Sequence, residues 1–242
     1  GIWVISPKRR FTNIWKDELW LFSGGIFGGS LYFFTENTAL GITQASNVSF
    51  IICTAPLLTT ILSLLFYKSE KASKGLIYGS LLALMGVGLI VFNGSFVLKI
   101  SPIGDLLTLL AALSWAFYSL IIKKMAGRYP TVFITRKIFF YGVLTILPAF
   151  LLHPLHPDTV VLLQPAVLFN LLFLAVLASL ICYVLWNGVL KQLGTVRASN
   201  YIYLNPLVTM IASFLILDEK ITLVALGGAA CIVCGVYWAE KK

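Results

Sequence analysis

The chain has 242 residues, of which 59% are hydrophobic and 11% are charged, and it carries a formal net charge of +9. So apolar a sequence cannot be buried in one soluble core, because charged residues must still cover the surface of a globule. The composition therefore excludes an ordinary soluble domain and indicates a lipid bilayer as a partner. Nucleic-acid binding is not indicated, because the basic residues lie in short connections rather than in one motif-bearing stripe.

Eight apolar runs are each long enough to cross a bilayer. About 20 helical residues, rising about 1.5 Å each, cover a hydrocarbon layer of about 30 Å, and lipid cannot pair the backbone groups of open strands. The spans are expected at residues 20–40, 48–67, 75–92, 103–122, 131–152, 167–190, 198–217 and 221–239. The sequence therefore predicts an all-α polytopic membrane protein without a soluble domain.

Basic residues in the connections predict the orientation. The connections before the first span and after the second, fourth, sixth and eighth hold most of the Lys and Arg residues, whereas the opposite ones hold only Lys99 and Lys220. By the positive-inside rule, the chain enters the first span from the cytoplasm and returns to the cytoplasm after the eighth span. The protein is therefore expected in the cytoplasmic (inner) membrane. Arg136 and Lys137 are expected inside the fifth span near its cytoplasmic end, either snorkelling or facing a wet cavity.

The two halves of the chain share one pattern, with a step of 150 residues that becomes 149 toward the end. Equivalent pairs include Asn37 and Asn187, Pro56 and Pro206, Gly79 and Gly228, and Gly86 and Gly235. Because five crossings separate the first span from its copy, the sixth, the copies are expected to run in opposite directions. Inverted repeats are typical of secondary transporters, whose substrate site lies between the repeats near the bilayer midplane.

The two copies differ in length. Residues 98–242 hold a complete repeat of five spans, whereas residues 1–97 hold three spans preceded by what looks like the last turn of another helix. The counterpart of the fifth span would fall at and before the first residues. We therefore expect the chain to belong to a ten-helix (5+5) protein and to lack its first two helices, and with them one wall of a central cavity.

Several stretches resemble the EamA-type transporters of the drug/metabolite transporter superfamily. They are YFFTENTAL at 32–40, SFIICTAP at 49–56, GVGLI at 86–90, SWAFY at 114–118 and RASNYIYLNP at 197–206. The resemblance covers nearly the whole chain and rests on order, spacing and duplication rather than on one specific motif. It implies ten helices in two inverted repeats around a central cavity, alternating access, and export of small metabolites.

Glu36 is the acidic residue placed most deeply in an apolar run. An ionised carboxylate at the centre of a bilayer costs roughly 2.5–3.5 kcal/mol on insertion scales, so such a residue suggests a function. One interpretation places Glu36 on the substrate path, where it meets a cationic group or takes up a proton. The alternative places it near the outer interface, where it hydrogen-bonds a neighbouring helix end.

Four further residues are candidates for the lining of a cavity. Trp115 and Tyr118, three residues apart in the fourth span, could form a stacking wall for an organic substrate or could simply pack. Tyr201 and Asn205 lie one turn apart on a polar stripe of the seventh span, which either lines the cavity or joins neighbouring helices.

Two pairs of equivalent residues suggest structural roles. Pro56 and Pro206 each remove a backbone donor near the middle of a span, which predicts a kink and a candidate hinge. Asn37 and Asn187 could contact substrate, but their equivalence favours a shared role in joining helices.

No nucleophile with a base, cofactor motif or metal site is visible. Cys231 and Cys234 lie in a span without a second pair, and His153 and His156 occur in a proline-containing connection. The alternatives to a transporter are an intramembrane enzyme acting on a lipid or quinone and a non-transporting helical scaffold. An enzyme predicts His, Asp, Glu or Cys clustered at one depth, and a scaffold does not need inverted duplication. We therefore expect a transporter of a small molecule; its substrate, direction, coupling ion (a proton is one candidate) and oligomeric state, including a dimer, stay open.

Overall fold

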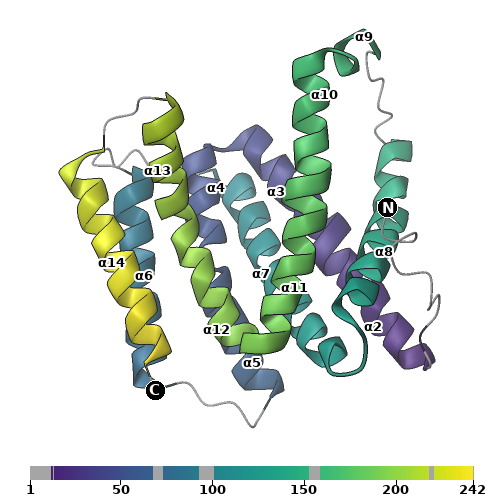
Figure 1. The fold of residues 1–242 in the computed structure, drawn as a ribbon, viewed down its shortest axis with the longest axis horizontal. Coiled ribbons are helices and arrows are strands. Elements are labelled where there is room, and N and C mark those ends of the chain that lie inside the picture. Colours follow the sequence, from purple (N-terminus) through teal and green to yellow (C-terminus); the bar gives the residue numbers. More distant parts are fainter. Residues whose placement is uncertain are drawn as a thin grey trace. The chain divides into compact units, whose positions relative to one another are not determined.

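The computed structural model describes residues 12, 14–67, 73–92, 101–152, 159–217 and 221–241, and every regular element in these ranges is helical (Figure 1). The elements are α2 (Trp15–Gly25), η1 (Ile26–Ser30), α3 (Leu31–Ile42), α4 (Ala45–Ile52), α5 (Ala55–Phe66), α6 (Lys74–Phe92), α7 (Pro102–Ala126), α8 (Thr131–Leu152), α9 (Thr159–Leu162), α10 (Pro165–Leu172), η2 (Phe173–Ile181), α11 (Cys182–Leu193), α12 (Thr195–Asn200), η3 (Tyr201–Leu204), α13 (Asn205–Leu217) and α14 (Leu223–Glu240). Of the three η segments, η1 and η2 are π-helices and η3 is a 3₁₀-helix.

Seven helical stretches among the described residues are long and apolar enough to cross a membrane. They are Ala45–Phe66, Lys74–Phe92, Pro102–Ala126, Thr131–Ala149, Pro165–Leu193, Thr195–Ile216 and Leu223–Glu240, which correspond to the second to eighth expected spans. The first expected span, residues 20–40, is helical as well but is not among the seven. Its glycines, Glu36 and Asn37 make it more polar than the others. The all-helical polytopic fold expected from the sequence is confirmed.

The described residues form two compact units. The first unit lies within residues 1–30 and 121–193, and the second lies within residues 31–120 and 194–242. In the first unit, α2 and η1 pack against α8. A Cβ added to Gly25 would come 2.5 Å from Cβ of Tyr141, and one added to Gly29 would come 3.0 Å from Cα of Gly142. Only glycine allows these backbones to lie so close together.

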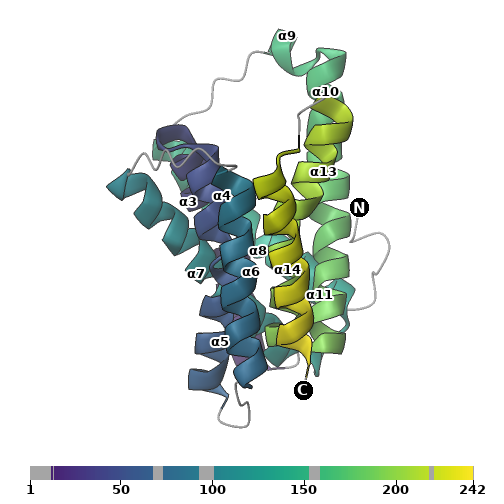
Figure 2. The ribbon, with the colours of Figure 1, turned by 90° about the vertical axis from the view of Figure 1, so that its left-hand side faces the viewer.

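In the second unit, α6 and α14 lie side by side (Figure 2). A Cβ on Gly79 would come 2.4 Å from the carbonyl oxygen of Gly235, and a Cβ on Gly228 would come 2.7 Å from that of Gly86. Because the partner number falls as the residue number rises, the two helices are antiparallel. The contact is also reciprocal, since Gly79 is equivalent to Gly228 and Gly86 to Gly235.

The core of the second unit contains pairs of equivalent residues from the two halves of the chain. These pairs are Cys53 and Tyr203, Ala83 and Ile232, and Val87 and Val236, and every member is buried. Equivalent sequence positions therefore meet around one apolar centre.

The interruptions expected near Pro56 and Pro206 are present. A turn at residues 53–54 separates α4 from α5, and the 3₁₀ segment η3 precedes α13. Each proline is the second residue of the helix after its interruption, a position where the missing N–H has no partner within the helix. The hinge role of the two prolines stays a prediction.

Candidate functional site

Glu36 lies half-buried on α3 in the second unit. The hydroxyl of Tyr32, one turn earlier, donates a hydrogen bond to Oε1 of Glu36 at 3.0 Å. Within the described ranges, no other donor reaches this carboxylate and no Lys or Arg forms an ion pair with it. An ionised carboxylate in an apolar span is costly without a cationic partner, so Glu36 is suited to take up a proton or to meet a cation.

Aromatic rings extend from this carboxylate. The ring centroids of Tyr32 and Trp115 are 5.1 Å apart, and those of Trp115 and Tyr118 are 5.2 Å apart. Tyr118 is fully buried, whereas Trp115 is partly exposed. We call Glu36, Tyr32, Trp115 and Tyr118 the Glu36 cluster. A carboxylate bonded to one member of a row of aromatic rings is an arrangement that suits organic cations, which aromatic faces also attract.

Three members of the Glu36 cluster, Glu36, Trp115 and Tyr118, were predicted from the sequence as candidate site residues. Tyr32 was not predicted. The sequence signal that could have identified Tyr32 is its spacing from Glu36, because side chains four residues apart lie next to each other on a helix. The contact between α3 and α7 that brings Tyr32 to Trp115 had no signal in the sequence.

Asn37 and Asn187 make different contacts in spite of their equivalent positions. Asn187 is buried in the first unit, and its Nδ2 donates to Oγ1 of Thr135 on α8 at 2.8 Å. Asn37 is exposed, and its Nδ2 donates to the carbonyl of Phe33 in its own helix at 2.7 Å. Helix joining therefore describes Asn187, whereas the contact of Asn37 leaves its role in substrate binding a prediction.

Tyr201 and Asn205 both lie in the second unit with exposed side chains. Tyr201 hydrogen-bonds Glu240 at the end of α14. Within the described part of the chain, no hydrogen bond or ring contact joins either residue to the Glu36 cluster. Their role in lining a cavity stays a prediction.

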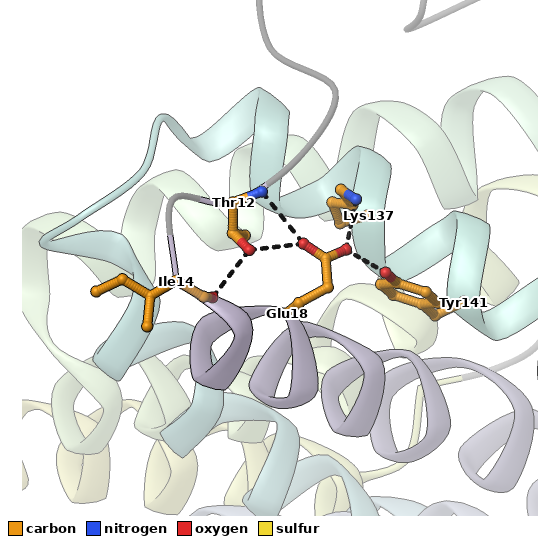
Figure 3. A network of polar contacts seen from close by, with 5 residues as sticks. All are labelled: Thr12, Ile14, Glu18, Lys137 and Tyr141. Carbon is orange, nitrogen blue, oxygen red and sulfur yellow. Dashed lines mark hydrogen bonds and ion pairs between the residues drawn. The ribbon is translucent and has the colours of Figure 1, made fainter.

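A second polar site lies in the first unit, around Glu18 near the start of α2 (Figure 3). Oε2 of Glu18 accepts hydrogen bonds from the backbone N–H of Thr12 at 3.2 Å and from its hydroxyl at 2.7 Å. Oε1 accepts from Nζ of Lys137 at 2.5 Å and from the hydroxyl of Tyr141, both on α8. We call these four residues the Glu18 network.

Asp17 forms a parallel contact beside the Glu18 network. Its carboxylate pairs with the Arg128 guanidinium at 2.7 Å and accepts from the Tyr129 hydroxyl at 2.9 Å. Asp17 is buried, whereas about half of the Arg128 side chain is exposed. Two adjacent carboxylates thus tie α2 to α8 and to the connection before it. Their place in the first turn of α2 is also favoured by the helix dipole.

The protonation of Glu18, which precedes the expected first span, is determined by these partners. Burial alone would raise the pKa of its carboxyl, but the hydrogen bonds from Lys137, Tyr141 and Thr12 outweigh burial and hold the pKa below its usual range. Glu18 is therefore ionised at neutral pH and acts as the counter-ion of Lys137.

Arg136 and Lys137 are both buried, so snorkelling, one of the two positions expected for them, does not describe them. Their facing a wet cavity stays a prediction. Lys137 is neutralised by Glu18, and the guanidinium carbon of Arg136 lies 5.2 Å from the ring centroid of Phe133. The sequence missed the ion pair because its two members are 119 residues apart.

Within the described ranges, no group of three His, Cys, Asp or Glu side chains could hold a metal ion. Cys231 and Cys234 are free cysteines. His153 and His156 lie outside the described residues.

Comparisons with known proteins place the chain in a family. The model of the EamA-like transporter family matches residues 1–92 and 102–239. A protein from Archaeoglobus fulgidus named an uncharacterized transporter is 30% identical over 251 residues, which cover 99% of this chain and 85% of that protein. A protein from Salmonella typhimurium named a "probable amino-acid metabolite efflux pump" is 29% identical over 182 residues. This match covers 71% of this chain and 60% of the Salmonella protein.

A similarly named efflux pump from Escherichia coli is 23% identical over 205 residues, covering 82% of this chain and 69% of its own. One solved crystal structure matches with a TM-score of 0.80 at 18% identity, covering 97% of this chain and 81% of that one. At that identity, the likeness shows the fold alone. The family model covers both halves of the chain, and the apolar helices are those of a multi-pass membrane protein. This chain therefore belongs to the EamA-like transporter family and is a membrane transporter rather than an enzyme.

Proposed function

We propose that this transporter exports a small metabolite with an ammonium group, such as an amino acid, and that the Glu36 cluster binds that group. The observation that carries the proposal is the environment of Glu36. Its carboxylate is hydrogen-bonded to Tyr32, whose ring contacts Trp115, which in turn contacts Tyr118, and it has no cationic partner within the described ranges. The names of the Salmonella and Escherichia relatives support an amino-acid-like substrate and the outward direction.

The chemistry of the cluster suits an ammonium group. Oε1 of Glu36 is held by Tyr32, so Oε2 is the oxygen that can accept from a ligand. An aromatic face within about 6 Å of a cation adds roughly 0.5–2 kcal/mol, more when water is excluded. Within the Glu36 cluster, Trp115 is partly exposed and in contact with Tyr32, whereas Tyr118 is fully buried, so Trp115 is the member on whose face the ligand would lie.

Transport would proceed by alternating access between two inverted repeats, residues 1–97 and 98–242. The antiparallel, reciprocal contact between α6 and α14 supports this part of the proposal, because equivalent helices of inverted repeats must run in opposite directions. The asymmetry of the basic connections supports a cytoplasmic C-terminus in the inner membrane. A proton that alternates with substrate at Glu36 is the form of coupling that the cluster would allow.

The test is transport in proteoliposomes. The purified protein is reconstituted, and flux of labelled amino acids and of simple amines is measured with and without a proton gradient. Glu36→Gln keeps the hydrogen bond to Tyr32 possible but removes the charge, so flux of ammonium-bearing substrates should fall at least about tenfold, the equivalent of 1.4 kcal/mol.

Glu240→Gln, at the far end of α14, is the matched control and should retain flux, because the Gln side chain can keep the hydrogen bond with Tyr201. Deaminated analogues should neither be transported nor compete. Unchanged flux in Glu36→Gln, or equal competition by deaminated analogues, would contradict the proposal.

A further inference from the structure

The two π-helical segments of the first unit occupy equivalent positions in the two halves of the chain. Adding 150 to η1, residues 26–30, gives residues 176–180, which lie inside η2, residues 173–181. π-Helices are rare in proteins and are frequently found at functional sites. The recurrence of one at the same place in both halves therefore points to a role in the transport cycle.

A π turn can change register. It closes hydrogen bonds between residues five apart, whereas an α turn closes them between residues four apart, so a π segment holds one residue more than the α-helix needs. If the segment becomes α-helical in place, the helix beyond it turns by about 100° and shifts by about 1.5 Å, the geometry of one helical residue.

The helix before η1 is fixed. Asp17 and Glu18 tie α2 to α8 and the connection before it, and Gly25 and Gly29 place the backbones of α2 and η1 directly against α8. Ser30, the last residue of η1, is 2.8 Å from Thr145 between their hydroxyl oxygens. A register change in η1 would therefore break the contact between Ser30 and Thr145 and turn α3 relative to α2.

The helix after η1 carries the proposed substrate site. Tyr32 and Glu36 lie on α3, which begins directly after Ser30. Along the chain, the first compact unit also gives way to the second at this residue. A turn of about 100° about the axis of α3 would point the Glu36 carboxylate toward a different side of the helix.

A second side chain, besides that of Thr145, holds η1 from outside its own helix. The hydroxyl of Tyr183 donates to the carbonyl oxygen of Gly28, in the middle of η1, at 2.8 Å. Tyr183 is buried, packs against Phe139 at 5.1 Å between ring centroids, and lies on α11 two residues after the end of η2. η1 is thus hydrogen-bonded to a residue that lies close to η2, the equivalent π segment in the other half of the chain.

We propose that η1 is a register switch that turns Glu36 during the transport cycle, and that Tyr183 is the positioning residue that holds the switch in its π form. The proposal rests on the proposed function in one respect, the binding of substrate at Glu36. The presence of the switch itself does not depend on that function.

Two single-residue deletions test the switch. Removing Phe27 takes the extra residue out of η1, so α3 keeps its orientation but the switch can no longer operate. We expect this variant to bind labelled amine as the parent does and to transport none. Removing Phe34 from the α-helical part of α3 is the matched control, which turns Glu36 by about 100° and should abolish binding as well.

Wild-type transport after removal of Phe27, or loss of binding equal to that caused by removal of Phe34, would overturn the proposal. Tyr183→Phe provides a second test, which keeps the packed ring and removes only the hydroxyl. Single cysteines placed along residues 33–40 in a background without native cysteines are labelled on the detergent-solubilised protein with a small, membrane-permeant maleimide, in the absence of substrate. The structure places Phe34, Asn37 and Thr38 on the exposed side of α3 and Thr35 and Ala39 on the buried side.

Loss of one hydrogen bond should shift the balance of the two registers by about 2- to 13-fold, so labelling should rise at buried positions relative to exposed ones. Tyr78→Phe, an exposed tyrosine on α6, should leave the pattern unchanged. An identical pattern in Tyr183→Phe and the parent would overturn the proposal. Because the labelling measurement needs no substrate, a negative result would overturn the register switch without testing the proposed function.

Discussion

Glu18 and Glu36 lie on the same continuous helical stretch, α2–η1–α3, but their surroundings are opposite. Glu18 accepts four hydrogen bonds, one of them from the ammonium of Lys137. Glu36 accepts one, from Tyr32, and has no cationic partner in the described part of the chain. A buried charge that is fully paired holds the fold together, whereas one left without a counter-ion remains available to a ligand.

The largest effect is expected from breaking the Glu18 network. Lys137→Met leaves an unpaired buried carboxylate, and removing one member of a buried ion pair typically costs about 3–5 kcal/mol of stability. Glu18→Gln combined with Lys137→Met removes both charges and should recover most of the loss. Thermal unfolding in detergent measures both variants. A single variant as stable as the parent would mean that the pair contributes nothing.

The second effect concerns Glu36 and should appear in transport rather than in stability. Glu36→Gln removes a charge that no cation in the described ranges compensates, so the protein should be as stable as the parent or slightly more stable. Its flux of ammonium-bearing substrates should fall at least about tenfold. Melting temperature and flux are measured on one preparation. A marked loss of stability would show that Glu36, like Glu18, has a structural partner.

Acid should weaken the Glu18 network in a defined range. Because the folded pKa of Glu18 is lowered, its ionised form adds stability that is fully present above the unfolded pKa, about 4.3, and that is lost as pH falls through the folded value. The difference in melting temperature between the parent and Glu18→Gln should therefore be constant from pH 8 to about 5 and shrink below it. A difference that changes between pH 6 and 8 would assign titration to another group.

The smallest effect is expected at the exposed member of the neighbouring pair. Arg128 has about half of its side chain in solvent, where an ion pair contributes about 0–1 kcal/mol. Arg128→Gln should therefore cost far less stability than Lys137→Met, because Asp17 keeps its hydrogen bond from Tyr129. Equal losses in the two variants would contradict this difference between the buried pair and the exposed one.

The sequence predicted what depends on composition and periodicity. Long apolar runs predicted the helices. The repeat pattern also paired Gly79 with Gly228 and Gly86 with Gly235, and the structure places these four glycines in one close contact between two helices. It also identified Glu36, Trp115 and Tyr118 as unusual, because a charge or a pair of aromatic residues within a span is visible without a partner.

The rest depends on contacts between distant residues. Glu18 and Lys137 are 119 positions apart, so the basic residues of the fifth span looked unpaired in the sequence. The π segments leave no composition signal either, because η1 and η2 contain the same small and apolar residues as the α-helices around them. Equivalent residues can also diverge, as Asn187 bonds Thr135 whereas Asn37 bonds its own helix.

The most direct test of the central claim is an experimental structure with a bound amine substrate, in which the substrate nitrogen is located. The account predicts the nitrogen at hydrogen-bonding distance from the Glu36 carboxylate, about 2.7–2.9 Å, and against the face of Trp115, with the Glu18 network unchanged. A nitrogen bound at Glu18 in place of Lys137, or a substrate that leaves Glu36 without contact, would contradict it.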